Sequence, residues 1–254
     1  GISIQNSWDD FLYISSSETS QSFLYSKYQQ NSIDDAKTKS YDNCYKLIYY
    51  IEQGKCFFDQ AIQSPLNIKP ILLFYGFGCL MKACIITVEP NYPAKTSVLA
   101  HGVSTRKKKR TNYQYLTDEV KIQKDGLFPH FSRLLFHFPP LDGLKITLKR
   151  LFMEVPEIAG FLNRWAGRQI VFPLEKEGDK WKVQEEILDS YHMTKERFLF
   201  FINEKMKGNI ILHIHENNLY FFPPAERKIA ETGPFRFNLQ DHCYYISNIK
   251  DDIS

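Results

Sequence analysis

Residues 70–88 read PILLFYGFGCLMKACIITV, an apolar stretch about as long as a helix that crosses a bilayer. Lys82 lies well inside this stretch, and inserting its charge into lipid would cost roughly 3 kcal/mol. A helix that is apolar on all sides also occupies the core of many soluble domains. We therefore predict a buried central helix that follows Pro70 and ends by Pro90, and we expect no membrane partner.

The residues before this stretch also have a helical pattern. Apolar side chains recur at three- and four-residue spacing over 41–51, which predicts an amphipathic helix that ends near Ile62, before Ser64-Pro65. Another apolar stripe begins at Trp8, where two acidic residues follow in the first turn of a predicted helix. The first part of the chain is therefore predicted to be mainly helical.

The later part of the chain has the two-residue period of strands. Residues 119–123 and 180–183 alternate polar and apolar side chains. The stretch NIILHIHENNLYFF, residues 209–222, places two apolar runs around Glu216-Asn217-Asn218 and predicts a β-hairpin. We predict an α+β fold, with a mainly helical domain over 1–165 and a smaller mixed α/β region, containing the hairpin, over 166–254. One continuous domain is the alternative.

Composition narrows the class of protein. The chain has 254 residues with 43% hydrophobic and 24% charged content, which excludes wholesale disorder. Its 32 Lys and Arg against 29 Asp and Glu give a net charge of +3, which excludes a histone-like polycation. The 5 cysteines form no Cys-x-x-Cys, so we expect no disulfide framework and a cytoplasmic location. No signal peptide is visible in the first residues.

Five consecutive basic residues form the most conspicuous feature of the sequence: Arg106, Lys107, Lys108, Lys109 and Arg110. Clustered cations neutralise phosphates, so this segment predicts contact with nucleic acid or another phosphate-bearing ligand. Tyr113 and Tyr115 follow closely and can stack on bases. His101, just before the segment, is predicted to contact the same anion or to act as a base. The alternatives are a solvated basic loop and a histidine that caps a turn.

The sequence carries no recognisable catalytic set. It has no Gly-x-Ser-x-Gly elbow, no Cys-His pair at a telling spacing and no Walker loop. Gly76 and Gly78 lie inside the apolar stretch, where close helix packing explains them better than a dinucleotide-binding turn. We therefore expect no cofactor and lean toward a protein that is not an enzyme.

Two histidines in the predicted hairpin raise the question of a metal site. His213 and His215 lie two apart on a strand, so both rings point to one face. Glu216, or Asp241 with His242, can complete such a site. We favour the alternative that the histidines lie on the solvent face of the hairpin, and we expect no metal.

Three stretches carry a family resemblance: YDNCYKLIYYIEQGKCFFDQA over 41–61, IKPILLFYGFGCLMKACIITVEPNYPAKTSVLAHGVSTRKKK over 68–109 and DEVKIQKDGLFPHF over 118–131. In these residues, and over most of its length, the chain resembles the YaaC-like proteins of Bacillus and its relatives. The resemblance implies a bacterial, cytoplasmic protein with a further helical stretch beyond residue 254. It carries over no catalytic residues.

The helical part is also similar in style to HEPN domains, many of which are ribonucleases with an Arg followed by a His some four to six residues later. The nearest match here runs from Arg133 to His137, while His101 and Arg106 have the reverse order. Three hypotheses remain: a non-catalytic binding or regulatory protein that uses the basic segment, a HEPN-like ribonuclease, and an interaction module. In the last, the aromatic surface over 41–58 binds another protein or a second copy.

Overall fold

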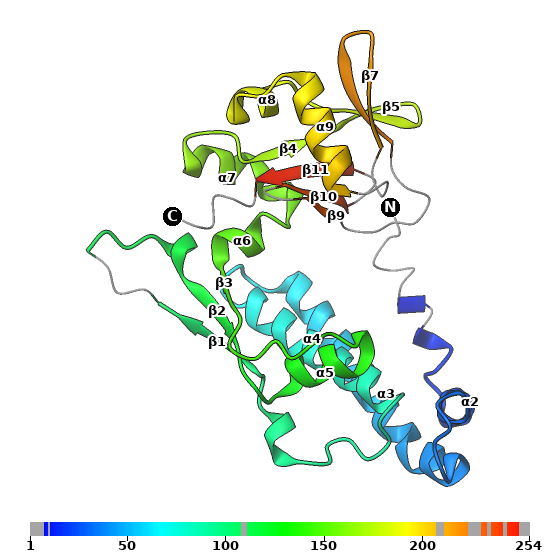
Figure 1. Cartoon of the computed structure of the whole chain (residues 1–254). Coiled ribbons are helices and arrows are strands. Elements are labelled where there is room, and N and C mark those ends of the chain that lie inside the picture. The colour runs from blue at the N-terminus through cyan, green and yellow to red at the C-terminus, as the bar shows by residue number, and fades with distance from the viewer. Residues whose placement is uncertain are drawn as a thin grey trace. The chain divides into compact units, whose positions relative to one another are not determined.

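The computed structural model describes residues 8–9, 11–107, 111–206, 211–222, 230–232, 235–240 and 243–248 (Figure 1). Its contacts form two compact units. Residues 2–106 and 120–145 form the helical unit, and residues 107–119 and 146–254 form the strand unit. Helices dominate the early chain and antiparallel strands the later chain, so the predicted α+β class is confirmed. The domain boundary near residue 165 stays a prediction.

The helical unit contains the α-helices α2 (Ser17–Gln30), α3 (Ala36–Gln63), α4 (Lys69–Ile86) and α5 (Leu127–Phe136). Ser16 caps α2 by accepting a hydrogen bond from the Thr19 backbone N–H. Pro70 lies in the first turn of α4, where a missing N–H costs nothing. Helix α3 packs against both α2 and α4. The helices predicted around 41–62 and after Pro70 are therefore confirmed.

Helix α4 is central to its unit, but its burial is uneven. The buried residues Ala83, Ile85 and Ile86 lie in its last turns, whereas Phe74 and Phe77 are 44% and 57% exposed. The all-round burial predicted from its composition is therefore met only near its C-terminal end, because neighbouring helices cover two of its sides. By length and composition, α4 alone among the described helices could cross a membrane, and 22% of its span is buried. A single helix of this kind is weak evidence of a membrane span, because core helices of soluble proteins share its length and composition.

A small sheet follows α4, in the order β1 (Val103–Arg106), β2 (Glu119–Ile122) and β3 (Lys145–Thr147). The strand β2 is confirmed, whereas the sequence predicted no strand at the position of β1. Its polar sequence, VSTR, carries no strand period, and pairing with β2 decides its conformation. Gly102 has a φ of +79°, and a Cβ on Gly126 would lie 2.3 Å from the Gly102 Cα, so this close approach requires both glycines.

The strands described in the strand unit form two four-stranded sheets. Their orders are β4-β11-β10-β9 and β5-β6-β8-β7. The bounds of the strands are β4 (Val171–Pro173), β5 (Glu175–Glu177), β6 (Lys180–Lys182), β7 (Ile211–His215), β8 (Asn218–Phe222), β9 (Ala230–Thr232), β10 (Phe235–Gln240) and β11 (Cys243–Asn248). The accompanying helices are α6 (Leu148–Phe152), α7 (Ala159–Ala166), α8 (Glu186–Tyr191) and α9 (Lys195–Met206).

The predicted hairpin is confirmed as β7 and β8, which pair antiparallel from Ile211↔Phe222 to His215↔Asn218. Glu216 and Asn217 form its two-residue turn with φ of +46° and +64°, as a turn that matches the strand twist requires. Apolar side chains from β4 of the first sheet, from the second sheet and from α8 and α9 form one core cluster, which includes Phe172, Trp181, Phe198, Ile202 and Phe221.

Candidate functional site

The basic segment begins at the end of β1. The side chains of Arg106 and Lys107 are exposed, and Lys108, Lys109 and Arg110 lie outside the described residues. The Lys107 Nζ lies 4.5 Å from the centroid of the Tyr113 ring, a close cation–π contact. The structure therefore brings together the second basic residue of the segment and the first of the two predicted stacking tyrosines.

Tyr113 is held in place by a buried carboxylate. Its hydroxyl donates a 2.6 Å hydrogen bond to the Asp118 Oδ2, and this bond is the main reason why the pKa of Tyr113 is raised. Asp118 is 8% exposed, and its backbone carbonyl accepts a hydrogen bond from Leu148. Tyr115, the second predicted stacking residue, is 58% exposed. A rigid anchor therefore positions the tyrosine next to the basic segment.

His101 lies in different surroundings from the basic side chains. Its exposed ring contacts Phe74 and Tyr75 of α4, with centroid distances of 4.8 Å and 6.0 Å. Arg106 lies at the opposite end of β1. Strand β1 thus connects the histidine, at an aromatic surface, with the basic segment, and the two are not gathered into one cluster of described contacts.

The two residues closest to the HEPN ribonuclease pattern have structural roles at the end of α5. The Arg133 guanidinium donates a 3.4 Å hydrogen bond to the Lys124 carbonyl. His137 ends the helix with a φ of +53°, and its backbone N–H donates to the Arg133 carbonyl. These contacts explain both residues as parts of a helix terminus.

A histidine–carboxylate pair in the helical unit was missed by the sequence reasoning. The His130 Nε2 lies 2.5 Å from the Glu89 Oε2, and the His130 ring stacks on the buried ring of Tyr92. Burial, followed by the nearby Tyr50 and Glu89, raises the pKa of Tyr92 to about 12. A carboxylate that orients an imidazole can support proton transfer. No sequence motif marks this pair, since its members lie 41 residues apart.

The hairpin histidines have the surroundings that we favoured. His213 and His215 are exposed, and their rings contact Phe222 and Tyr220 of the neighbouring strand. Within the described ranges, no three His, Cys, Asp or Glu side chains gather as a metal site. Asp241 and His242 lie outside those ranges, so their part in the metal hypothesis stays a prediction.

The pattern of one protein family, described as YaaC-like Protein, matches residues 12–254. The chain belongs to the YaaC-like family. This membership confirms the resemblance carried by residues 41–131. No curated protein and no solved structure matches the chain. The family assignment therefore names no substrate, partner or site residue for this YaaC-like protein.

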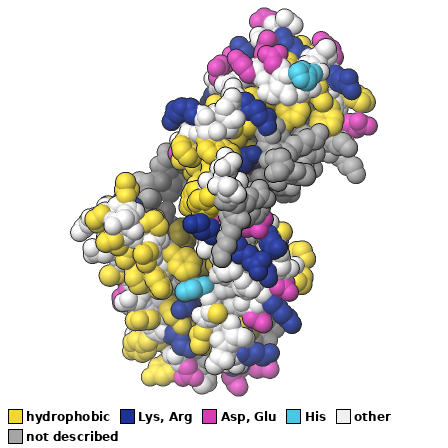
Figure 2. Space-filling model, turned by 90° about the vertical axis from the view of Figure 1, so that its left-hand side faces the viewer, with side chains coloured by type: hydrophobic (Ala, Val, Ile, Leu, Met, Phe, Trp, Pro, Cys, Tyr) yellow, Lys and Arg dark blue, Asp and Glu magenta, His cyan; other side chains and the backbone are white. Residues whose placement is uncertain are grey.

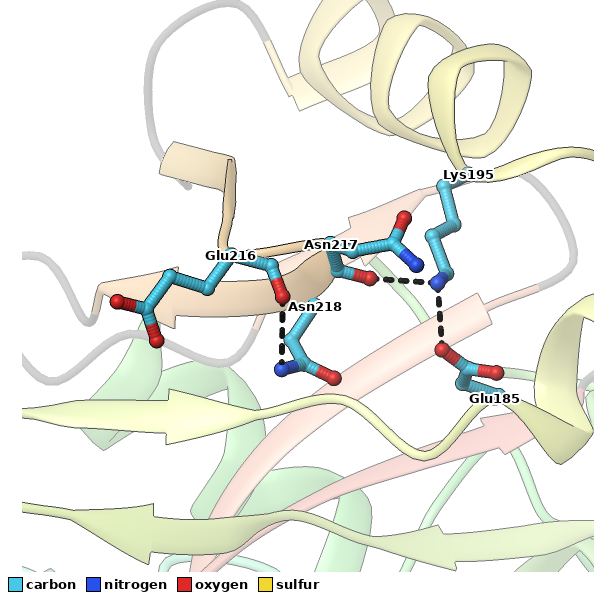
Figure 3. Close-up of polar contacts among 5 residues, drawn as sticks. All are labelled: Glu185, Lys195, Glu216, Asn217 and Asn218. Carbon is cyan, nitrogen blue, oxygen red and sulfur yellow. Dashed lines mark hydrogen bonds and ion pairs between the residues drawn. The ribbon is translucent and has the colours of Figure 1, made fainter.

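The strand unit of this YaaC-like protein contains a polar recess of about 380 Å³ beside the hairpin turn. The Lys195 Nζ donates a 2.5 Å hydrogen bond to the Asn217 carbonyl and lies 2.5 Å from the Glu185 Oε1 (Figure 3). Glu185 and Asn218 both line the recess, and Asn218 donates to the Glu216 carbonyl. Lys195 thus ties the turn to the start of α8 and fixes one wall. The lining mixes three glutamates with one lysine, so it favours no single class of ligand.

Proposed function

We propose that this YaaC-like protein is a cytoplasmic, non-catalytic binding or regulatory protein whose basic segment, residues 106–110, contacts nucleic acid or another phosphate-bearing ligand. One observation carries the proposal. Arg106 and Lys107 are exposed, and no carboxylate of the described residues pairs with either side chain. Cations that no carboxylate neutralises are free to neutralise phosphates.

The contact between Lys107 and Tyr113 suggests how the segment would bind. When a phosphate draws the ammonium away, the ring face of Tyr113 becomes available to a base, and the hydrogen bond to Asp118 keeps the ring in place. Tyr115 offers a second exposed ring two residues later. His101, at the other end of the strand that leads to the segment, is the sixth proposed binding residue and would donate a ring N–H to a phosphate.

Fluorescence anisotropy with labelled single-stranded RNA and duplex DNA over a salt series tests the proposal. The test variant carries Lys107→Gln, Lys108→Gln and Lys109→Gln. Its matched control carries three equal charge changes elsewhere, Lys37→Gln, Lys39→Gln and Lys95→Gln. We expect steep salt-dependent binding by the parent and the control. In the test variant the salt slope should fall by about one for each phosphate that the replaced lysines no longer neutralise.

Other outcomes would contradict the proposal. Equal binding by the test variant and the control would reduce the segment to a solvated loop. Negligible binding by all three proteins would favour the interaction module instead, since Tyr41, Tyr45 and Tyr49 form an exposed stripe on α3. Cleavage of the RNA by the parent, abolished by His101→Ala, would support the ribonuclease.

A further inference from the structure

The helical unit contains a pocket of about 140 Å³ beside α4, and none of the residues that line it belongs to the basic segment. Most of its wall is apolar, with Phe74, Leu99, Leu127 and Phe128 among the lining side chains. Figure 2 shows hydrophobic side chains gathered over part of this unit. Apolar cavities of about 150 Å³ are large enough to bind benzene. The pocket therefore has the size and lining of a site for one small apolar group.

The walls of the pocket are held by the backbone. Residues 100 and 101 accept hydrogen bonds from the first turn of α5, Leu127 to Ala100 at 2.7 Å and Phe128 to His101 at 3.2 Å. Gly78 supplies the floor on α4 without a side chain, and a Cβ there would lie 3.7 Å from Leu127. Because these elements are fixed to one another, the pocket is largely formed before a ligand arrives.

One lysine brings a positive charge to this lining. Lys82 is half-buried, and none of the residues that line the pocket with it is acidic. Among the described residues its ammonium makes one contact, with the Tyr50 ring at 5.9 Å. Burial raises the pKa of the Cys79 thiol, and the charge of Lys82 opposes this rise, so the ammonium lies near a second lining residue. A half-buried cation without a carboxylate favours an anionic ligand.

We propose that this pocket binds a small organic acid, with its carboxylate paired to Lys82 and its aromatic or branched apolar body against Phe74, Leu99 and Phe128. The charge selects an anion, and the apolar wall with its small volume selects a compact body. The exposed ring of His101, packed edge-on against Phe74, borders the same pocket and can add a hydrogen bond to the carboxylate. This site uses none of the basic side chains of residues 106–110 and shares only His101 with the proposed phosphate site.

Isothermal titration of the full chain tests the site with three probes: benzoate, its neutral isostere benzamide, and acetate, which has the charge without the body. We expect benzoate to bind at least about tenfold more tightly than either of the others. In Lys82→Met the affinity for benzoate falls about tenfold or more while that for benzamide is unchanged. Lys69→Met, on the same helix but outside the pocket, serves as the matched control and binds benzoate like the parent.

A second variant covers the case in which Lys82→Met does not fold. Gly78→Leu places a side chain into the pocket and is expected to abolish binding of both aromatic probes, with helical content by circular dichroism unchanged. The variant with Lys107, Lys108 and Lys109 changed to Gln keeps its benzoate affinity if the two sites are separate. Absence of saturable benzoate binding by the parent up to about 10 mM would overturn the proposal, as would equal affinities in the parent and Lys82→Met.

Discussion

Helix α4 presents two sides made of the same apolar residue types, but the neighbouring helices pack against these two sides with different closeness. Toward α3, an added Cβ on Gly76 would lie 3.0 Å from the Phe58 ring, so the helices meet without spare room. Toward α5, an added Cβ on Gly78 would lie at an ordinary contact distance, 3.7 Å, from Leu127 and would face the pocket. Glycine thus serves close packing on one side of the helix and opens a cavity on the other.

The two sides also differ in whether their buried polar groups have hydrogen-bond partners. On the α3 side, the buried Tyr28 hydroxyl donates a 2.7 Å hydrogen bond to the Ile86 carbonyl and accepts one from Asn43. On the α5 side, the Tyr92 hydroxyl is buried without a partner among the described residues, and Lys82 lines the pocket without a carboxylate, while its ammonium also contacts the Tyr50 ring of α3. These buried polar groups of the α3 side are therefore hydrogen-bonded, whereas the α5 side keeps polar groups without a hydrogen-bond or carboxylate partner among the described residues, as binding surfaces commonly do.

Replacing the glycine on each side by leucine should give the largest difference in the free energy of unfolding between the two sides. Gly76→Leu forces Phe57 and Phe58 of α3 to move, and such overpacking should lower the free energy of unfolding by about 3 kcal/mol. Gly78→Leu is the matched control, since its side chain enters the pocket and should change stability by less than about 1 kcal/mol. Urea unfolding of both variants measures the difference. Equal losses of stability would mean that the two sides are packed alike.

Removing one hydroxyl from each side gives the next effect. Tyr28→Phe leaves the Ile86 carbonyl and the Asn43 amide without this partner, so we expect a decrease of about 2 kcal/mol in the free energy of unfolding at pH 7. Tyr92→Phe removes a hydroxyl that has no partner among the described residues and should cost less than about 0.5 kcal/mol. A cost of Tyr92→Phe as large as that of Tyr28→Phe would show that the Tyr92 hydroxyl is satisfied.

The sequence could predict the helices and strands of this arrangement better than the way in which they pack against one another. Periodicity located α3, and two apolar runs around a turn located the β7–β8 hairpin, because these patterns repeat along a continuous stretch. Helix α4 was located by its continuous apolar run. It could not locate β1, whose polar residues extend only because β2 pairs with them. Composition predicted that α4 is apolar but not which side stays open, since that depends on where α3 and α5 lie.

The candidate sites also differ in how far the sequence could predict them. The basic segment is contiguous, so its charge is visible in the sequence, and the structure adds the contact of Lys107 with Tyr113. The α4 pocket combines residues from α4, from residues 99–103 and from α5, and no spacing rule joins these segments. The pair of His130 and Glu89 was likewise hidden, because only the packing of α5 against the end of α4 brings the two side chains together.

The smallest expected effect is a loss of unfolding free energy at alkaline pH that depends on Tyr92. Burial is the main cause that raises the pKa of Tyr92 from 10.0 to about 12, so the folded state disfavours the phenolate relative to the unfolded chain. The contribution of this group to stability is therefore complete below pH 10 and is lost as the pH rises toward 12. Between pH 9 and pH 11 the parent should lose about 1.4 kcal/mol of unfolding free energy more than Tyr92→Phe does. The pKa of Tyr28 is also raised to about 12, and Tyr28 is present in both proteins, so its contribution cancels in the comparison.

Urea unfolding of the parent and Tyr92→Phe at pH 9, 10 and 11 measures this difference directly. Curves of unfolding free energy against pH that stay parallel for the two proteins would mean that the Tyr92 phenolate is solvated in the folded state. The α5 side of α4 would then be open to water as far as Tyr92, and the contrast between its two sides would extend beyond the pocket to the end of the helix.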